Sequence, residues 1–302
     1  MTNWSITTFV PEGGAATAAI RREDGSFIVP DFLRGYPGLR ELLDDWTVLE
    51  SLLRVIDVTS WDAVAGEELL SIRHPNKLLC VGANYRDHIA EMGVDDIPAD
   101  VDPFFFSVPP TTSLVGAGAP VVLGAGAAHR PDWEAELAVV IGRAGVDIPV
   151  DAALDHVAGY ACFNDITARG LMRRPDPIAV PFTWDWAASK GRDSYSPLGA
   201  MTPAWQIPVP EALGIRCIVN GTLKQNGNTS NLIVGIAQIV SAASRSWTLE
   251  PGDVIATGTP AGVGHSRGEQ LRDGDVVRVE IDGLAPLQNP VTVHAAAPVG
   301  TH

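Results

Sequence analysis

Two acidic residues separated by one alanine lead directly into an apolar run, and this pattern limits how the segment can fold. The residues are Glu134 and Glu136, and the run continues from Leu137 to Ile141. Such a run is typical of a buried β-strand, on which side chains at positions i and i+2 share one face. Two carboxylates on one face repel each other unless a positive charge lies between them. The pattern predicts a divalent cation held by oxygen ligands, or else two solvated glutamates on an exposed strand.

A third carboxylate, Asp165, follows the predicted strand 159–163. Residues at the end of a strand commonly line the mouth of a site, so Asp165 is the candidate third ligand. Three carboxylates suit Mg²⁺ or Mn²⁺ and leave about three octahedral positions for substrate and water. A structural Ca²⁺ at the same three residues is the alternative.

Composition excludes several classes of protein. The 302 residues carry a formal net charge of −15, with 46% hydrophobic and 19% charged residues. A globular chain without a basic stripe is a poor partner for nucleic acid or for an anionic membrane. No apolar run reaches the roughly 20 residues needed to span a bilayer, and residues 1–5 do not begin a signal peptide. Three widely spaced cysteines are expected to be reduced core residues, which predicts a cytoplasmic protein.

A change of pattern near residue 72 divides the chain. Residues 1–72 are predicted to form a small N-terminal domain, with strands at 5–10 and 17–21, a short helix at 38–46, and a helix or turn at 62–70. Residues 73–302 are predicted to form a larger, mostly β domain in the α+β class, with a frayed tail at 295–302. One long helix is expected to begin at a cap on Thr229 or Ser230 and to reach Trp247. The predicted strands of the larger domain are 77–82, 120–123, 136–142, 159–163, 215–219, 254–257 and 276–281.

His88 and Glu91 are the candidate general base and its partner. They lie three residues apart on a predicted short helix, so they share a face. A carboxylate beside an imidazole fixes its tautomer and makes it more basic, although many such pairs are exposed and have no role. The polar, Gly- and Pro-containing stretch 93–103 follows and favours a hinge, so the short helix is a candidate lid.

Other candidates are a lysine and two glycine-bounded stretches. Lys190 precedes Gly191 and follows two tryptophans, and several positive charges lie between Arg169 and Arg192, where an anionic substrate would find its counter-charges. The stretches 221–229 and 252–264 match neither a Walker loop nor a dinucleotide fingerprint. They are tight turns, and the second can also offer backbone N–H groups and a hydroxyl to a carboxylate.

In this order, the segments closely resemble the fumarylacetoacetate hydrolase family over residues 77–293. The matching pieces are Asn84-Tyr85-x-x-His88-x-x-Glu91, Glu134-x-Glu136-Leu137-Ala138-Val139-Val140-Ile141-Gly142, Asn164-Asp165-x-x-Ala168-Arg169, Lys190-Gly191, Pro197-Leu198-Gly199, Asn220-Gly221, Gln225-x-Gly227-x-Thr229, and residues 251–263 with Thr257-Gly258-Thr259-Pro260. The resemblance implies a mixed β-sandwich roll carrying the site, preceded by a small variable domain, and a homodimer.

The resemblance also assigns roles. It implies that Glu134, Glu136 and Asp165 are metal ligands, that His88 and Glu91 form a catalytic dyad on a lid helix, and that Lys190 is the active-site lysine. It places four residues in substrate binding, namely Tyr85, Arg169, Gly258 and Thr259.

The activity implied is hydrolysis of a C–C bond in a β-diketo or acylpyruvate-type acid through a metal-chelated enolate. An oxaloacetate-type decarboxylase or a keto-diacid isomerase would use the same metal site. A metal-dependent small-acid binding protein without activity is the alternative of another class. The sequence departs from the family at Met172, where many members have glutamine, and at Val108, where many have lysine. Both changes make the pocket less polar. Arg173 and Arg174 either compensate for the lost polarity or are simply solvated.

Overall fold

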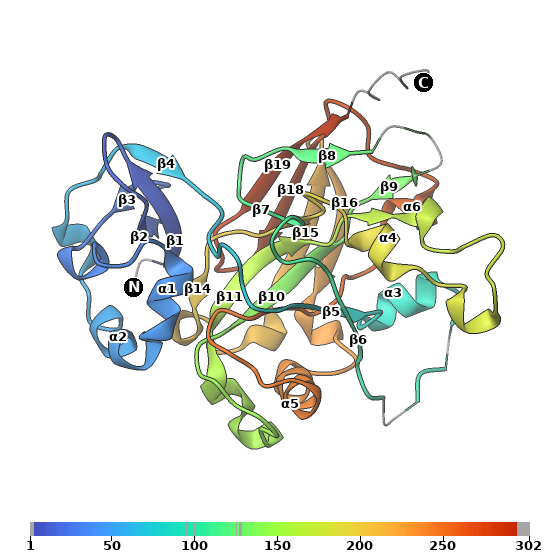
Figure 1. Cartoon of the computed structure of the whole chain (residues 1–302), viewed down its shortest axis with the longest axis horizontal. Helices are drawn as coiled ribbons and strands as arrows, with labels where there is room; N and C mark the ends of the chain where they lie inside the picture. The colour runs from blue at the N-terminus through green and yellow to red at the C-terminus, as the bar shows by residue number, and fades with distance from the viewer. Residues whose placement is uncertain (1–2, 95, 99–100, 125, 127–128, 295–302) are drawn as a thin grey trace.

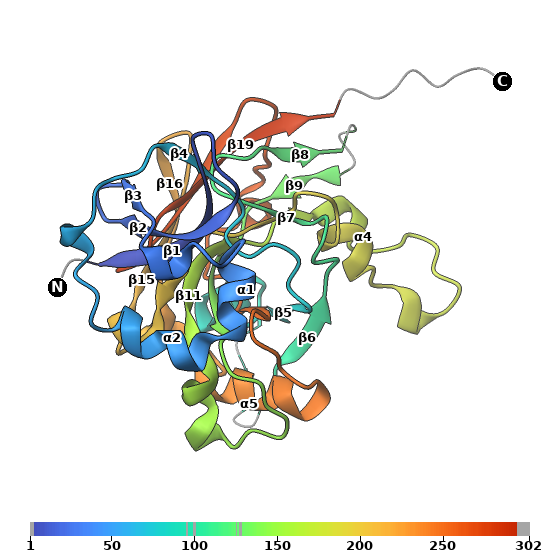
Figure 2. The ribbon, with the colours of Figure 1, turned by 60° about the vertical axis from the view of Figure 1, so that its left-hand side comes forward.

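The computed structural model describes residues 3–94, 96–98, 101–124, 126 and 129–294 (Figure 1). The first part of the chain forms a four-stranded sheet in the order β3-β2-β1-β4, beside two helices. Apolar side chains of this part pack with residues of the central sheet in one shared core, and Trp46 stacks on Trp205 with ring centroids 5.7 Å apart. The elements are β1 (Trp4–Pro11), β2 (Thr17–Arg22), β3 (Phe27–Ile28), β4 (Gly66–Glu68), α1 (Leu39–Asp44) and α2 (Trp46–Leu53). Figure 2 brings this part to the front.

The central sheet has six strands in the order β14-β11-β10-β17-β5-β6. Every residue of its two long strands, β10 and β11, is buried. Alternate residues of β10 enter different cores: Leu137 and Val139 face one cluster, and Ala138 and Val140 face the other. Burial on both faces explains why β10 is apolar throughout from Leu137 to Ile141. The strands are β5 (Leu78–Gly82), β6 (Phe104–Ser107), β10 (Ala135–Ile141), β11 (Val157–Asn164), β14 (Thr202–Pro203) and β17 (Val254–Ala256).

A five-stranded sheet, in the order β16-β15-β18-β19-β8, covers one face of the central sheet. Its strands β15 and β18 alternate between buried and half-buried residues, as a sheet with a single core face requires. The strands are β8 (Val121–Leu123), β15 (Gly214–Val219), β16 (Thr222–Asn228), β18 (Val276–Ile281) and β19 (Leu287–Val293). The remaining elements are β7 (Leu114–Val115), β9 (Pro131–Asp132), β12 (Thr167–Ala168), β13 (Ser196–Pro197), α3 (Arg86–Glu91), α4 (Trp186–Lys190), α5 (Ile236–Ser246) and α6 (Gly264–Arg267).

The mixed, mostly β fold class is confirmed, and each of the predicted strands corresponds to a strand of the structure. The prediction of a helix or turn at 62–70 was wrong, because Gly66–Glu68 pairs with β1 instead. The start of the long helix was also wrong, because α5 begins at Ile236 after a Gly235 cap. Leu232 forms a bridge with Tyr85, and the N–H of Ile233 donates to the Asn84 carbonyl, so these residues are held extended.

Three further predictions concern the cysteines, membrane-spanning helices and the C-terminal tail. The cysteines Cys80, Cys162 and Cys217 are buried and free. Across the described ranges, no helix has the length and apolar character that crossing a membrane requires. The predicted frayed tail at 295–302 lies outside the described residues. The domain boundary near residue 72 and the location in the cytoplasm stay predictions.

Candidate metal centre and active site

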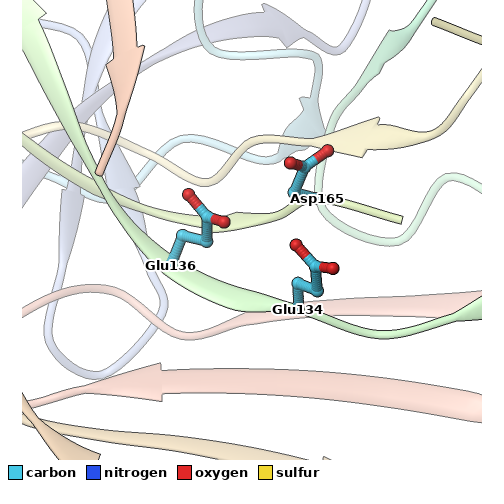
Figure 3. A group of neighbouring side chains, drawn as sticks. All are labelled: Glu134, Glu136 and Asp165. Atoms are coloured by element: carbon cyan, nitrogen blue, oxygen red, sulfur yellow. The ribbon is translucent and has the colours of Figure 1, made fainter. Parts of the chain in front are cut away.

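Three buried carboxylates meet at the ends of two neighbouring strands. Glu134 directly precedes β10, Glu136 is the second residue of that strand, and Asp165 follows β11 directly. The antiparallel register explains their meeting, since Ala135 pairs with Asn164 and the N–H of Asp165 donates to the Glu134 carbonyl at 2.9 Å. One oxygen from each carboxylate lies within 4.8 Å of the others, and Figure 3 shows the three side chains gathered in one place. The prediction that Glu134 and Glu136 share one face, with Asp165 at the end of the next strand, agrees with this arrangement.

Two basic side chains are paired with this acidic group. Lys190, the last residue of α4, places Nζ 2.7 Å from Oε2 of Glu134 and 2.6 Å from Oδ2 of Asp165. The Arg169 guanidinium lies 2.5 Å from Oε1 of Glu134 and donates from Nε to Oδ2 of Asp132 at 2.9 Å. All of these side chains are buried or nearly so. A buried charge is tolerated only when it is paired, so the two cations and the carboxylates hold one another in place.

The pKa values of the three carboxyls differ because their neighbours differ. Burial raises the pKa of Glu136, and the nearby charges of Asp165 and Glu134 raise it further. Burial also raises the pKa of Asp165, although Lys190 opposes the shift. Burial alone would raise the pKa of Glu134, but Lys190 and Arg169 together lower it. Lys190 and Arg169 therefore do not fully neutralise the negative charge of the acidic group. The remaining repulsion between carboxylates favours binding of a further cation.

The donor set suits a hard divalent metal ion. Oδ1 of Asp165 is buried, and within the described part of the chain it has no hydrogen-bond partner. Oε2 of Glu136 accepts a hydrogen bond from the Gly258 N–H at 2.7 Å, which fixes that carboxylate's orientation. Three buried carboxylates, one of them with an unpaired oxygen, form the oxygen-only environment that Mg²⁺ and Mn²⁺ prefer. The site therefore fits a divalent metal ion held by Glu134, Glu136 and Asp165.

The predicted dyad is formed on the short helix α3. His88 Nδ1 and Glu91 Oε1 are 2.7 Å apart. The other oxygen of Glu91, Oε2, accepts hydrogen bonds from the Gly262 N–H and the Ser266 hydroxyl, each at 3.0 Å. Burial would raise the pKa of Glu91, but the hydrogen bonds from His88, Gly262 and Ser266 lower it. Because Nδ1 is committed to Glu91, proton exchange with a ligand must use Nε2 of His88.

The dyad and the acidic group belong to one site. One segment contacts both, since the Gly258 N–H donates to Glu136 and the Gly262 N–H donates to Glu91, the partner of His88. His88 and Lys190 are both buried, at 8% and 3% exposure. Lys190 Nζ also lies 5.5 Å from the ring centre of Phe106, which stacks on Trp186. The arrangement combines a cation-binding group, an ammonium and an imidazole in a dry environment.

The residues predicted to bind substrate lie at or beside this site, and they differ in the hydrogen bonds that they already make within the protein. Tyr85 is fully buried, and its hydroxyl has no hydrogen-bond partner among the described residues. Gly258 adopts φ +96° and uses its N–H to hold Glu136. The Thr259 hydroxyl donates to the Ala135 carbonyl at 2.8 Å and accepts from Gln225, so the fold already occupies it. Arg169 is paired as described above. The substrate-binding roles of these four residues stay predictions.

Sequence reasoning missed Asp132 and Ser266. Asp132 accepts hydrogen bonds from the N–H groups of Gly264 and His265 and pairs with Arg169. It lies two residues before Glu134, which was the available signal, but its partners come from distant parts of the chain. Ser266 lies just after the glycine-bounded stretch 252–264. The sequence indicated that this stretch can offer backbone N–H groups to a carboxylate, and its N–H groups do contact carboxylates.

The two departures from the family pattern have different surroundings. Val108 is buried in an apolar cluster. Met172 is half-buried and directly follows the short 3-10 helix Arg169–Leu171. The segment between that helix and α4 projects from the body of the protein in both ribbon views. Within that segment, Arg174 is paired with Asp185 at 2.5 Å, and Arg173 is exposed. Arg174 is therefore committed to a partner outside the acidic group.

Comparisons with known proteins agree on one family. The family model described as fumarylacetoacetate (FAA) hydrolase C-terminal matches residues 77–292. The mitochondrial oxaloacetate tautomerase fahd2 of Xenopus laevis is 40% identical over 226 residues, covering 74% of this chain and 67% of the relative.

Two solved structures extend the comparison to the fold. The fumarylacetoacetate hydrolase of Exiguobacterium antarcticum has a TM-score of 0.80 at 31% identity, covering 96% of this chain and 100% of that one. The fumarylpyruvate hydrolase of Pseudomonas aeruginosa, solved with Mn²⁺ and pyruvate, has a TM-score of 0.64 at 33% identity, covering 76% and 93%.

Proposed function

The chain belongs to the fumarylacetoacetate hydrolase family, and we propose that it is a divalent-metal-dependent hydrolase that cleaves a C–C bond in an acylpyruvate-type acid. The observation that carries the proposal is the His88–Glu91 pair beside a buried group of three carboxylates and a lysine. Hydrolysis of a keto acid requires a base that takes a proton from water and a cation site that binds the keto acid. A histidine with a fixed tautomer beside a cation-binding group provides both.

Glu134, Glu136 and Asp165 would hold Mg²⁺ or Mn²⁺, and Ca²⁺ is the alternative ion. When bound, such an ion acts as a Lewis acid that stabilises negative charge on an oxygen of the substrate. Two solved relatives support this assignment, since the fumarylpyruvate hydrolase of Pseudomonas aeruginosa and the maleylpyruvate hydrolase of Sphingobium both contain Mn²⁺ and pyruvate. The substrate is therefore proposed to be a small-molecule keto acid.

The protein's own residues supply the proton transfer and the charge stabilisation. His88 takes a proton from water through Nε2, and Glu91 stabilises the resulting imidazolium. The hydroxide adds to the carbonyl farther from the substrate carboxylate, and the Lys190 ammonium stabilises the oxyanion that forms. The C–C bond then breaks, and His88 returns its proton, so that one water molecule and one acylpyruvate give pyruvate and a carboxylic acid. Arg169, with Tyr85, Gly258 and Thr259, is proposed to orient the substrate carboxylate.

Tautomerisation of oxaloacetate is the second candidate function. The observation in its favour is the 40% identity to the tautomerase of Xenopus laevis, against 31% and 33% to the hydrolases of Exiguobacterium antarcticum and Pseudomonas aeruginosa. A tautomerase moves a proton between carbon and oxygen, and His88 could carry that proton without activating water. Decarboxylation of oxaloacetate and isomerisation of a keto-diacid would use the same acidic group.

The organisation of the protein is proposed with the activity. We propose an N-terminal domain of residues 1–72, a catalytic domain of residues 73–302, a homodimer and a cytoplasmic location. The homodimer and the location rest on family resemblance and composition. Sedimentation of the purified protein would test the homodimer directly.

The test of the activity is a product analysis. The metal-stripped protein is incubated with acylpyruvates and with oxaloacetate, with and without Mn²⁺, while enol absorbance and pyruvate are followed. Metal-dependent release of pyruvate together with the matching carboxylic acid is the expected result. A change in enol absorbance of oxaloacetate without cleavage of any acylpyruvate would establish the tautomerase instead. Binding of the acids without turnover of any of them would leave a non-catalytic binding protein.

A further inference from the structure

Burial of the site requires a conformational change before a substrate can enter. His88, Lys190 and the three carboxylates are all buried, so a substrate can reach them only if part of the structure moves. The helix α3 carries His88 and has only six residues, beginning directly after a turn that follows β5 (Figure 1). A short helix carrying the base is the natural candidate for that movement.

The two ends of α3 are attached in different ways. At its start, the Asn84 side chain donates to the carbonyls of Val234 and Thr257 at 3.1 and 3.0 Å and accepts from the Val234 N–H at 2.9 Å. The next residue, Tyr85, is fully buried. This end is therefore fixed in the core. The other end passes into the exposed Met92, and Glu91, the last residue of the helix, is hydrogen-bonded to Gly262 and Ser266.

Glu91 joins the lid to the body with one carboxylate that also holds the base. Its Oε1 lies 2.7 Å from His88, and its Oε2 receives hydrogen bonds from Gly262 and Ser266. If Oε2 is released, the carboxylate is free to rotate, and the imidazole loses its fixed partner. Closure of the helix and orientation of the base therefore depend on the same carboxylate.

Ser266 has the properties of a reversible attachment. Its hydroxyl lies 3.0 Å from Glu91 and 2.8 Å from the carbonyl of Val263. A hydroxyl has one proton to donate, so it can serve only one of these acceptors at a time. When Glu91 departs, the proton can turn to Val263, and opening leaves no unpaired hydroxyl donor behind.

The segment that carries Ser266 is itself fixed to the site. The N–H of Gly258 holds Glu136, and the N–H groups of Gly264 and His265 hold Asp132, which pairs with Arg169. A Cβ on Gly264 would lie 2.6 Å from Asp132, so glycine is required for this approach. Ser266 therefore presents its hydroxyl from a surface whose position is set by the acidic group.

We propose that Ser266 is a positioning residue that, through Glu91, holds the lid helix α3 closed and orients His88. The part of the proposal that concerns His88 rests on the proposed function, whereas the part that concerns the lid does not. Ser266 itself touches neither the acidic group nor the imidazole.

The test compares three variants of the full-length, Mn²⁺-loaded protein. Ser266→Ala removes the hydroxyl, and Ser266→Thr retains it. Ser51→Ala is the matched control, because Ser51 is also exposed and donates to a carbonyl three residues earlier, that of Val48, but has no bond to a lid. Hydrogen exchange of the amides of Ile89 and Met92 reports on the lid without any need for turnover. The Ile89 amide donates to Tyr85 and the Met92 amide to His88.

We expect Ser266→Ala to speed exchange at Ile89 and Met92 roughly three- to tenfold, the range for loss of one net hydrogen bond. We expect kcat to fall by a comparable factor with less change in KM, and Ser266→Thr to restore both. Unchanged exchange in Ser266→Ala would overturn the proposal. Faster exchange with unchanged kcat would overturn the positioning of His88 and keep only the attachment of the lid. If the wild type turns over no acylpyruvate or oxaloacetate, the proposed function fails, and the exchange result still decides whether Ser266 holds α3.

Discussion

The acidic group and the lid helix form one site but are built in opposite ways. Glu134 and Glu136 belong to a fully buried segment whose strand β10 is paired with β11 on one edge and β17 on the other. His88 and Glu91 lie on a helix of six residues that is fixed at one end and held at the other by hydrogen bonds to Glu91. The difference places the proposed cation ligands in the strand-paired core and the proposed base on the helix that we propose to move.

The rigid region is expected to show the largest effect. Glu134→Ala removes a proposed ligand that also pairs with Lys190 and Arg169. We expect kcat/KM to fall about a thousandfold or more, since a metal ion supplies several kcal/mol of charge stabilisation. We also expect Mn²⁺ affinity, measured by titration calorimetry, to fall strongly.

Asp253→Ala is the matched control for Glu134→Ala. Asp253 is also a buried carboxylate paired with a lysine, since its Oδ2 lies 3.0 Å from Nζ of Lys77. This substitution should lower the melting temperature and leave Mn²⁺ affinity unchanged. Equal Mn²⁺ affinity in the wild type and Glu134→Ala would remove Glu134 from the ligand set and break the comparison between core and lid.

The lid should affect turnover without affecting the cation. For His88→Ala we expect kcat to fall about a hundredfold or more, which is the usual contribution of a general base. Mn²⁺ affinity should stay at the wild-type value, because the imidazole is not among the three carboxylates that face one another. His156→Ala is the control, because His156 is a half-buried histidine whose ring nitrogen is hydrogen-bonded to the Arg143 carbonyl. Loss of Mn²⁺ affinity in His88→Ala would show that the two regions are not separable.

Removal of the metal tests whether the core is rigid without it. Lys190 and Arg169 neutralise part of the acidic group, so we expect the metal-free protein to stay folded and to unfold cooperatively. Mn²⁺ at a hundred times its Kd should raise the free energy of unfolding by about 2.7 kcal/mol through mass action. Calorimetric unfolding with and without chelator measures this difference. Unfolding of the protein by chelator at room temperature would instead indicate a structural ion, as a Ca²⁺ site would have.

The sequence could predict those parts of the site that depend on residues close together in the chain. Period-two alternation put Glu134 and Glu136 on one face, and the apolar run after them indicated the buried strand. The i, i+3 spacing likewise predicted that His88 and Glu91 meet on a helix. These inferences use contacts between neighbours in the chain, and such contacts are fixed by backbone geometry alone.

The contacts that hold the lid were beyond sequence reasoning. Ser266 and Glu91 are 175 positions apart, and Asp132 is 132 and 133 positions from its amide partners Gly264 and His265. The same cause moved the start of the long helix. Thr229 is a residue type that commonly caps helices, but the bridge between Tyr85 and Leu232 keeps the following residues extended until Gly235. Tertiary pairing there overrides the local preference.

The smallest expected effect concerns the outer attachment of the lid region. Asp102, in the segment after α3, pairs with Arg245 of α5 at 3.0 Å, and both side chains are largely exposed. Exposed ion pairs contribute about 0–1 kcal/mol, so Arg245→Ala should change kcat/KM less than about fivefold. Arg216→Ala, which breaks a partly exposed pair with Asp282 on the five-stranded sheet, is the control for a general loss of stability. If Arg245→Ala alone slowed turnover as much as His88→Ala, the lid would be held mainly from its outer side. The contact through Glu91 would then be a consequence of closure, because a helix already held shut by Arg245 would bring Glu91 to Ser266 without needing that bond.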